Sequence, residues 1–370
     1  MRLQTAAVRG RSIRPLPAFV TSSALFACLA SGAFATGREV MFDEPDSTDE
    51  FLLVPPSTGE YAPSVPDPRV GRVPDLIARG LSVEPDSWVG PLVDTLLAGL
   101  AGDSARLRVI HDWVTLNIGY DTALLSSAAP GETDAAAALR RGCSGCAGYS
   151  NVFELLCRSA GIECVTVTGY ARGFGFDFFA SEDPTVPNHA WNAVRIDGSW
   201  QLVDATWDAG HVRGGHYEPR YATDFLLAPP GAFIYTHLPC ETTWQLLERP
   251  VSPGEFTRLP YLPGEFFRFG LRLVEPLSRV TEAGRTARVE VWVSDDISLF
   301  ARIICPDGRR LHSGVTGRRQ LEKVVFDIEL PGPGRWSVGL FARPAPAAGE
   351  HTCVALFEFV WRGGPTGPGG

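Results

Sequence analysis

The stretch that most constrains this chain runs from residue 141 to residue 207 and combines a helix with a hairpin. The helix is predicted by apolar residues that recur with the 3.6-residue period of an amphipathic α-helix. That apolar face consists of Tyr149, Val152, Phe153, Leu156, Cys157 and Ala160. Gly161 follows as a helix stop, and Cys146 precedes the face at the expected first turn. The sequence therefore places a thiol at the N-terminus of a helix.

Cys146 lies where a cysteine ionises most easily. The first helical turn exposes unpaired N–H groups and the positive end of the helix dipole, and both favour an anion. A helix N-terminus and a protonated histidine together lower a thiol pKa from about 8.5 to roughly 3.5–7.5. Because the thiolate is the nucleophilic form, this position suits covalent catalysis. The structural alternative for Cys146 is a disulfide or a packed core residue.

The hairpin is predicted by Asp197-Gly198, which lies between two alternating runs and is a strong signal for a two-residue turn. In the register that follows, His189, Trp191 and Asp204 share one face of the sheet. His189 and Asp204 then become diagonal neighbours, roughly 7–8 Å apart at the backbone, within reach of a side-chain hydrogen bond. The expected pairs are Ile196–Ser199, Trp191–Asp204 and His189–Thr206.

Three motifs together resemble the transglutaminase-like superfamily, which shares the papain-like fold. They are C-x-G-Y-S-x-x-F from Cys146, H-A-W-N-x-V from His189 and W-x-L-V-D-A-T-W from Trp200. The resemblance implies that Cys146 is a nucleophile, His189 a general base and acid, and Asp204 the carboxylate that orients His189. Residues 224–239 and the segment that begins at Trp244 are similar to the kyphoscoliosis peptidase branch.

Cys143 and Cys146 form a C-x-x-C pair, and the residues that follow decide between them. Gly148, Tyr149 and Phe153 have the family spacing when they are counted from Cys146. The chain shows no second C-x-x-C for a zinc site and no thioredoxin-like context for a redox motif. We expect that Cys143 can bond to Cys146 and switch it off, because the spacing brings the two close.

Residues 1–35 are typical of an export signal, with a basic start, an apolar core and small residues at the cleavage site. The alternatives are an uncleaved membrane anchor, although the apolar run is short for a span, and lipidation at Cys28. We therefore expect a secreted or extracytoplasmic protein that contacts a membrane only if its N-terminus anchors it. An oxidising compartment would allow disulfides. Cys305–Cys353 is the expected bridge, and Cys157 and Cys164 either pair or simply pack.

The remaining chain divides by composition and pattern. Hydrophobic residues make up 45% and charged residues 20%, which is enough for a sizeable core. We expect a largely disordered linker at 36–72, a catalytic domain at 73–250 and a flexible tail at 363–370. Short alternating strands between Pro-Gly and Pro-Asp-Gly turns predict a β-sandwich of the immunoglobulin kind at 256–362. The fold class is therefore α+β.

Several partners and cofactors are excluded at this level. The net charge is −9, with 33 basic and 42 acidic residues and no basic patch, so nucleic acid is a poor partner. We find no nucleotide, cofactor or metal motif. Asp208, His211 and His216 together with Asp204 match no zinc spacing, and a solvated loop is expected there. The phenylalanine-rich segment 174–179 either lines a substrate cleft or packs on itself.

The expected function is an exported acyl-transfer enzyme that acts on protein or peptide amide bonds through a thioester, using Cys146, His189 and Asp204. The Cys146 backbone N–H is one donor to the oxyanion, and the second donor is not identified. Only the family resemblance favours a peptidase. The alternatives are a crosslinking transglutaminase and a non-catalytic scaffold or binding protein that retains the fold.

Overall fold

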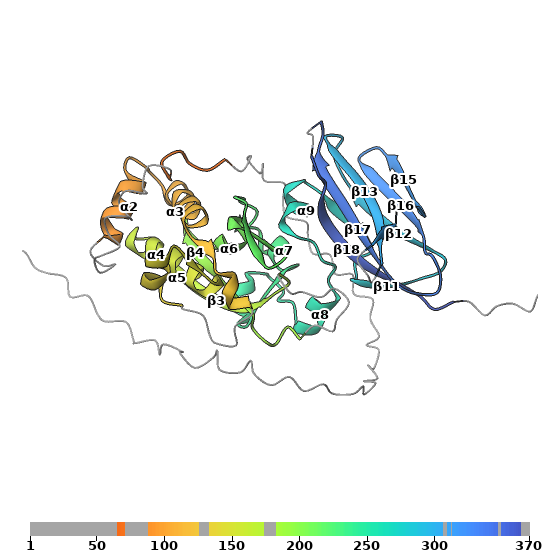
Figure 1. Ribbon diagram of the computed structural model, residues 1–370, viewed down its shortest axis with the longest axis horizontal. Helices are drawn as coiled ribbons and strands as arrows, with labels where there is room; N and C mark the ends of the chain where they lie inside the picture. Colours follow the sequence, from red (N-terminus) through yellow and green to blue (C-terminus); the bar gives the residue numbers. More distant parts are fainter. Residues whose placement is uncertain are drawn as a thin grey trace, which may run out of the picture.

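The computed structural model describes residues 65–70, 88–125, 133–173, 183–305, 309–311, 313–346 and 349–363. Within these ranges a mixed helix and sheet domain is followed by an all-β domain, with α8 and α9 between them (Figure 1). The expected α+β class with a C-terminal β-sandwich is confirmed. The expected export signal, the phenylalanine-rich segment and nearly all of the expected tail lie outside the described residues.

The first domain contains most of the helices. The α-helices and 3-10 helices are α2 (Val89–Leu97), α3 (Asp103–Asn117), η3 (Thr122–Leu125), α4 (Ala135–Arg141), α5 (Cys146–Ser159), α6 (Ala205–Ala209), α7 (Pro230–Phe233) and η4 (Thr242–Gln245), followed by α8 (Pro253–Arg258) and α9 (Gly264–Arg268). The strands are β1 (Gly119–Tyr120), β2 (Cys143–Ser144), β3 (Cys164–Ala171), β4 (His189–Ile196), β5 (Ser199–Val203), β6 (Gly210–Arg213), β7 (His216–Pro219), β8 (Leu226–Ala228) and β9 (His237–Pro239). Among the described residues, no helix is both long and apolar enough to cross a membrane.

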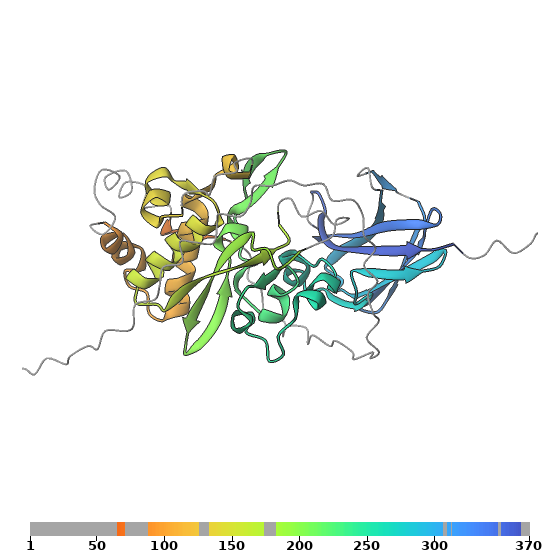
Figure 2. The same cartoon turned by 90° about the horizontal axis from the view of Figure 1, so that it is seen from below.

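A five-stranded antiparallel sheet in the order β8-β5-β4-β3-β9 forms the centre of this domain. The helices α2 to α5 gather at the far end of the molecule from the second domain, and the sheet lies between (Figure 2). Both faces of β4 are buried: Val194 and Ile196 pack in the helical core, while Trp191 and Ala193 pack in a second cluster. A strand covered on both faces is held in one register, because a slip would exchange the two faces.

Helix α5 follows the sequence prediction. It begins at Cys146, and every residue of the predicted apolar face is buried. The helix closes through Gly161, whose φ of 74° is readily adopted by glycine. The thiol of Cys146 is therefore carried by the first turn of a fully packed helix.

The hairpin is confirmed at its turn and wrong at its far end. Asp197 and Gly198 both have positive φ, as a tight hairpin turn requires, and Ile196 pairs with Ser199. The β4–β5 ladder stops where Asn192 pairs with Val203, so the expected pairs Trp191–Asp204 and His189–Thr206 do not form. The reason is capping. Asp204 leaves the strand to become the N-cap of α6, and its side chain accepts two backbone N–H bonds there.

The second domain is a sandwich of two sheets. Its strands are β10 (Arg272–Glu275), β11 (Val280–Ala283), β12 (Thr286–Trp292), β13 (Ile297–Ile304), β14 (Arg310–Leu311), β15 (Val315–Gln320), β16 (Lys323–Glu329), β17 (Gly334–Pro344) and β18 (Thr352–Trp361). One sheet has the order β10-β12-β16-β15 and the other the order β11-β18-β17-β13-β14. Their inner faces share one apolar core, which begins at Leu262. The first strand of the sandwich, β10, begins at Arg272, within the predicted range 256–362.

The expected Cys305–Cys353 disulfide is absent, and both residues are free thiols, as are the other five cysteines of the described chain. Cys305 directly follows β13, whereas Cys353 lies in β18, and β17 separates these two strands. Two strand spacings amount to roughly 9–10 Å. Bridged cysteines have Cα atoms no more than about 7 Å apart, so the topology forbids this bond.

The end of the expected linker is ordered. The backbone N–H of Asp67 donates to Asp112 Oδ2 at 2.8 Å, and Val70 is buried in the helical core. Residues 65–70, at the end of the largely disordered linker expected at 36–72, are therefore held by a buried carboxylate and an apolar core. Residues 36–64 and 71–72 lie outside the described residues.

Arg172 ties the end of β3 to the segment that leads into the sandwich. Its buried guanidinium donates to the carbonyl oxygens of Tyr235 at 3.2 Å, Phe256 at 2.5 Å and Leu259 at 3.1 Å. Beyond Leu259, Tyr261 forms a backbone bridge to Leu356 in β18. A continuous set of hydrogen bonds therefore runs from the central sheet to the second domain.

Candidate active site

Cys146, His189 and Asp204 come together although three different elements carry them. Asp204 is fully buried at the N-cap of α6, and its Oδ2 lies 2.6 Å from Nε2 of His189, the first residue of β4. A carboxylate can only accept, so His189 Nε2–H is the donor. The thiol of Cys146 is hydrogen-bonded to His189, which leaves the ring between the sulfur and the carboxylate.

Neighbouring charges in the trio favour the ionised thiol. Burial raises the pKa of Cys146, but the charge and hydrogen bond of His189, together with the Ala190 N–H, bring it below its ordinary value. Burial lowers the pKa of His189, but the charges of Asp204 and Cys146 outweigh burial and raise the pKa to about 10. Burial also opposes ionisation of Asp204, and His189 nevertheless holds its pKa well below the usual range. The three groups together stabilise a thiolate beside an imidazolium.

The motif residues around Cys146 have structural reasons. A Cβ on Gly148 would lie 1.9 Å from Ser144 Oγ, so only glycine lets the strand before the cysteine approach the helix. Asn192 in β4 donates its amide N–H to the Ser150 carbonyl at 3.0 Å, which joins the histidine strand to the cysteine helix. The hydroxyl of Tyr149 donates to the Ile118 carbonyl. These contacts fix the sulfur relative to the imidazole.

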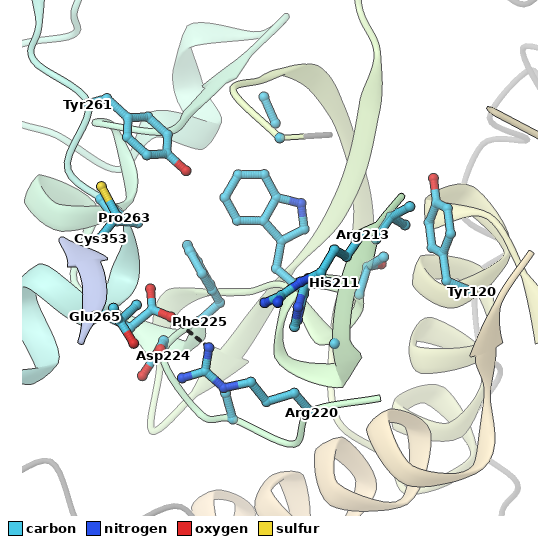
Figure 3. A pocket seen from close by; sticks show the side chains of 18 of the residues that line it. Tyr120, His211, Arg213, Arg220, Asp224, Phe225, Tyr261, Pro263, Glu265 and Cys353 are labelled. Carbon is cyan, nitrogen blue, oxygen red and sulfur yellow. Dashed lines mark hydrogen bonds and ion pairs between the residues drawn. The ribbon is translucent and has the colours of Figure 1, made fainter. Parts of the chain in front are cut away.

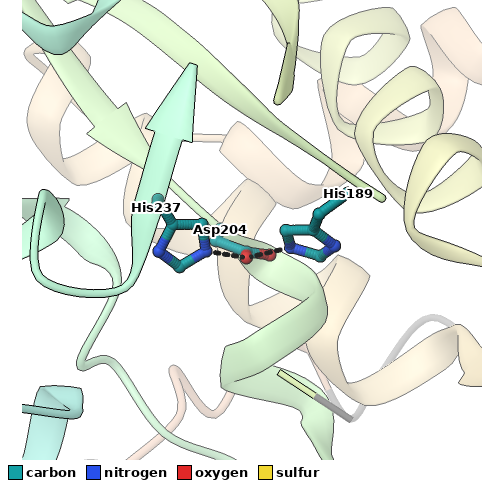
Figure 4. Close-up of side chains that lie close together, drawn as sticks. All are labelled: His189, Asp204 and His237. Atoms are coloured by element: carbon teal, nitrogen blue, oxygen red, sulfur yellow. Dashed lines mark hydrogen bonds and ion pairs between the residues drawn. The ribbon is translucent and has the colours of Figure 1, made fainter. Parts of the chain in front are cut away.

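A second histidine, which the sequence reasoning missed, completes the site. His237 begins β9, and its Nε2 lies 3.1 Å from the same Asp204 Oδ2 that accepts from His189 (Figure 4). Burial is the main cause that lowers the pKa of His237 to about 4. The ring is therefore neutral near pH 7. The short motif Thr-His-Leu-Pro gave no signal of this role, because the long-range pairing of β3 with β9 places it.

The ligand atoms of His189, Asp204 and His237 all lie within 4.8 Å of one another, a spacing at which a cation can bind. In this structure, Oδ2 of Asp204 accepts a hydrogen bond from each of the two histidine rings, so the three side chains form a hydrogen-bonded network. The group that the sequence analysis weighed as a metal site, Asp208, His211 and His216 with Asp204, does not come together. Asp208 accepts from His111 at 2.9 Å, and His211 pairs with Glu218 at 3.1 Å on a separate hairpin.

A cavity of about 910 Å³ opens from this site toward the sandwich. Its lining includes His189 and Trp207 but not Cys146, so it reaches the site from the histidine side. Figure 3 shows Tyr261, Glu265 and Cys353 on one side and Tyr120, His211 and Arg213 on the other. From the sandwich come Arg310, Phe341, Glu350, His351, Thr352, Cys353 and Leu356. The volume is at the upper end of the range for ligand pockets.

Comparison with known proteins identifies the class of fold. Residues 91–205 match the family model of the transglutaminase-like superfamily, so this part of the chain is a transglutaminase-like domain. The match ends one residue after Asp204 and includes both Cys146 and His189.

Among named proteins, the chain is 31% identical over 273 residues to kyphoscoliosis peptidase of Mus musculus, covering 72% of this chain and 40% of that protein. Hillarin of Drosophila melanogaster is 30% identical over 218 residues, covering 54% of this chain and 26% of hillarin. A solved TGase structure has a TM-score of 0.25 and 18% identity, covering 44% of this chain and 38% of that one. The chain thus spans about 40% of the length of the mouse protein.

Proposed function

We propose that this chain is an exported thiol enzyme that cleaves amide bonds of polypeptides, with Cys146 as nucleophile. One observation carries the proposal: His189 bonds to the Cys146 thiol on one side and to the Asp204 carboxylate, 2.6 Å away, on the other. This order of thiol, imidazole and carboxylate serves nucleophilic catalysis. The similarity to kyphoscoliosis peptidase supports hydrolysis over crosslinking.

The reaction follows from the atoms that face one another. The Cys146 thiolate attacks the amide carbonyl carbon, and a tetrahedral oxyanion forms. Because Nε2 of His189 is held by Asp204, the proton for the leaving amine comes from Nδ1. Loss of the amine leaves a thioester on Cys146. His189 then removes a proton from water, which attacks the thioester and frees the thiol, while Asp204 holds the ring throughout.

Tyr120 is our candidate for the second oxyanion donor, beside the Cys146 backbone N–H. Tyr120 lines the cavity with His189, and its strand β1 pairs with β2 so that it lies opposite Ser144, close before Cys146. Burial raises the pKa of Tyr120, and the charges of Cys146 and Asp204 raise it further. The hydroxyl therefore keeps its proton and remains a donor.

The cavity supports a polypeptide as the substrate. It extends from His189 to side chains of the sandwich, and its lining mixes aromatic rings with charges of both signs. A single metabolite needs only a few convergent polar groups. A cavity lined by side chains of two domains instead suits an extended segment with varied side chains.

Alkylation by iodoacetamide tests the nucleophile, with Cys240 as an internal control because it is a free and exposed cysteine. We expect Cys146 to react much faster than Cys240 near neutral pH, and His189→Ala to remove this advantage.

Casein with a fluorescent primary amine tests which reaction the enzyme catalyses. Fragments mean hydrolysis, amine incorporation means crosslinking, and equal alkylation of the two cysteines means a non-catalytic scaffold. N-terminal sequencing of protein recovered outside the cytoplasm tests export.

A further inference from the structure

The ring of His237 is packed among aromatic side chains. It is fully buried, with Trp207 and Phe233 at ring-centroid distances of 4.4 and 4.2 Å and Trp191 and Phe225 at 5.1 and 5.3 Å. These four aromatic rings exclude water from both of its faces. A polar ring in such a place is stable only when its nitrogen atoms have hydrogen-bond partners.

Both nitrogen atoms of His237 have such partners. Nε2 lies 3.1 Å from Asp204 Oδ2, and Nδ1 lies 2.8 Å from Thr236 Oγ1. Because the carboxylate can only accept, Nε2 carries the proton, and Nδ1 accepts from the threonine hydroxyl. The carboxylate therefore selects the tautomer in which His237 donates to Asp204, and the threonine hydroxyl gives the other ring nitrogen a partner.

Asp204 gains a complete set of donors in this way. Its Oδ1 accepts the backbone N–H groups of Thr206 at 2.9 Å and Trp207 at 3.2 Å, and its Oδ2 accepts from both histidines. Four donors from two sides leave the carboxylate no freedom to rotate. A carboxylate that accepts several hydrogen bonds also remains ionised to low pH.

We propose that His237 is a positioning residue of this site, whose neutral ring donates to Asp204 and thereby fixes the carboxylate that orients His189. The proposal rests on the proposed function of Cys146, His189 and Asp204. His237 does not itself line the cavity, and its hydrogen bond within the site goes to Asp204. Its effect on the reaction therefore passes through Asp204.

The pH dependence distinguishes positioning from packing. The titratable groups that face His237 are Asp204 and His189, with Cys146 behind His189, and its remaining neighbours are aromatic rings and Thr236. Losing the donor raises the pKa of Asp204, because a hydrogen bond to the charged form is lost. A carboxylate that is held less firmly also stabilises the His189 imidazolium less, so the Cys146 thiolate is protonated more easily and the acid-side decline of its reactivity moves to higher pH. A packing defect alone lowers the folded fraction and leaves the pH profile in place.

The test compares His237→Phe, which keeps a ring but no donor, with His237→Gln, whose amide N–H can reach the position of Nε2. The readout on the full chain is the rate of Cys146 alkylation by iodoacetamide across pH, with Cys240 as reference. We expect His237→Phe to react on the order of tenfold more slowly and to lose reactivity at higher pH. His237→Gln should recover most of both properties.

Two results would overturn the proposal: a His237→Phe profile that matches the wild type, or equal losses in the Phe and Gln variants. If His237→Phe does not fold, Thr236→Val decides, since it leaves Nδ1 of His237 without its partner and so weakens the hold on the ring that donates to Asp204. An unchanged profile in Thr236→Val would then refute the role. Failure of the proposed function looks different, because wild-type Cys146 would then react no faster than Cys240.

Discussion

Nε2 of His111 lies 2.9 Å from Oδ2 of Asp208, one helical turn after Asp204 in α6. The other ring nitrogen of His111 lies 3.2 Å from Asp112, which Arg108 and Tyr221 also contact. All three of His111, Asp112 and Asp208 are fully buried. The helix that carries the candidate catalytic carboxylate is therefore anchored from behind by a second network of charged groups.

Removing the His111 ring should destabilise the fold. His111→Leu leaves Asp208 buried without its charged partner, and breaking a buried pair in this way costs about 3 kcal/mol or more of unfolding free energy. Chemical denaturation measures the loss. The control is His216→Leu, because His216 is exposed and its loss should change stability by less than about 0.5 kcal/mol.

The difference in stability between wild type and His111→Leu should depend on pH. Burial lowers the pKa of His111, but Asp112 and Asp208 outweigh burial and raise it above its ordinary value. Because the pKa of His111 is higher in the folded state, protonation of this histidine stabilises the fold. This stabilisation is complete below the unfolded pKa of about 6.5 and is lost as the pH rises through the folded pKa. The difference in unfolding free energy between wild type and His111→Leu should therefore become smaller as the pH rises through the folded pKa of His111. A gap that widens with pH contradicts this assignment.

Tyr120→Phe separates oxyanion stabilisation from thiol activation. The change removes one hydroxyl donor and keeps the ring, so turnover of a peptide substrate should fall by about 10²-fold. The iodoacetamide rate of Cys146 should change little, because alkylation forms no oxyanion. Equal losses in turnover and alkylation would show that Tyr120 acts on the sulfur instead.

Gly148→Ala should disturb the cysteine helix. The new Cβ would meet Ser144 Oγ at 1.9 Å, and overpacking of this kind costs about 1–3 kcal/mol. We expect lower thermal stability and slower alkylation of Cys146. Gly90→Ala is the matched control, since it also lies in a helix but its Cβ would meet nothing within 4 Å. Identical behaviour of the two variants would remove the stated reason for the motif glycine.

Arg310 tests the contribution of the sandwich to substrate binding. It lines the cavity, with its guanidinium 4.7 Å from the centroid of the Phe341 ring. Arg310→Ala should raise KM for casein a few-fold and leave kcat nearly unchanged, which marks lost uniform binding. Short peptides that do not reach the sandwich should show no change. Arg318→Ala, in β15 of the other sheet, serves as control.

The pairing of Cys143 with Cys146 stays a prediction. Both thiols are free, and Cys143 lies in β2, directly before the turn that leads into α5. Oxidation should bring Cys146 labelling down to background, and a reductant should restore it. Cys143→Ser should abolish this sensitivity to oxidation. Cys240 labelling reports the general effect of the oxidant, and a parallel fall at both sites would refute a specific pair.

Local features were readable from the sequence where short-range chemistry decides them. The turn at Asp197-Gly198 needs two residues with positive φ, and the period of the face that begins at Tyr149 needs only a helix. Asp204 was placed near His189 for a partly wrong reason. In the structure Asp204 caps α6, and this capping ends the strand before the expected pair can form.

The features that sequence reasoning missed depend on long-range pairing. His237 reaches Asp204 from 33 residues further along the chain, because β9 pairs with the edge of β3. Gly169 allows this pairing, since a Cβ there would lie 2.3 Å from the Leu238 carbonyl oxygen. The cavity depends on how two domains meet, and no pattern within either domain encodes that arrangement.

Arg172 has a mechanical consequence for the cavity. One buried guanidinium holds the carbonyl groups of Phe256 and Leu259, in the segment that leads into the sandwich, together with that of Tyr235 in the first domain. Moving the segment away would deprive the Phe256 and Leu259 carbonyl groups of their donor at once. We therefore expect the cavity between the two domains to keep a fixed width. It would then admit one extended polypeptide segment, and a folded domain would have to unfold locally before it could enter.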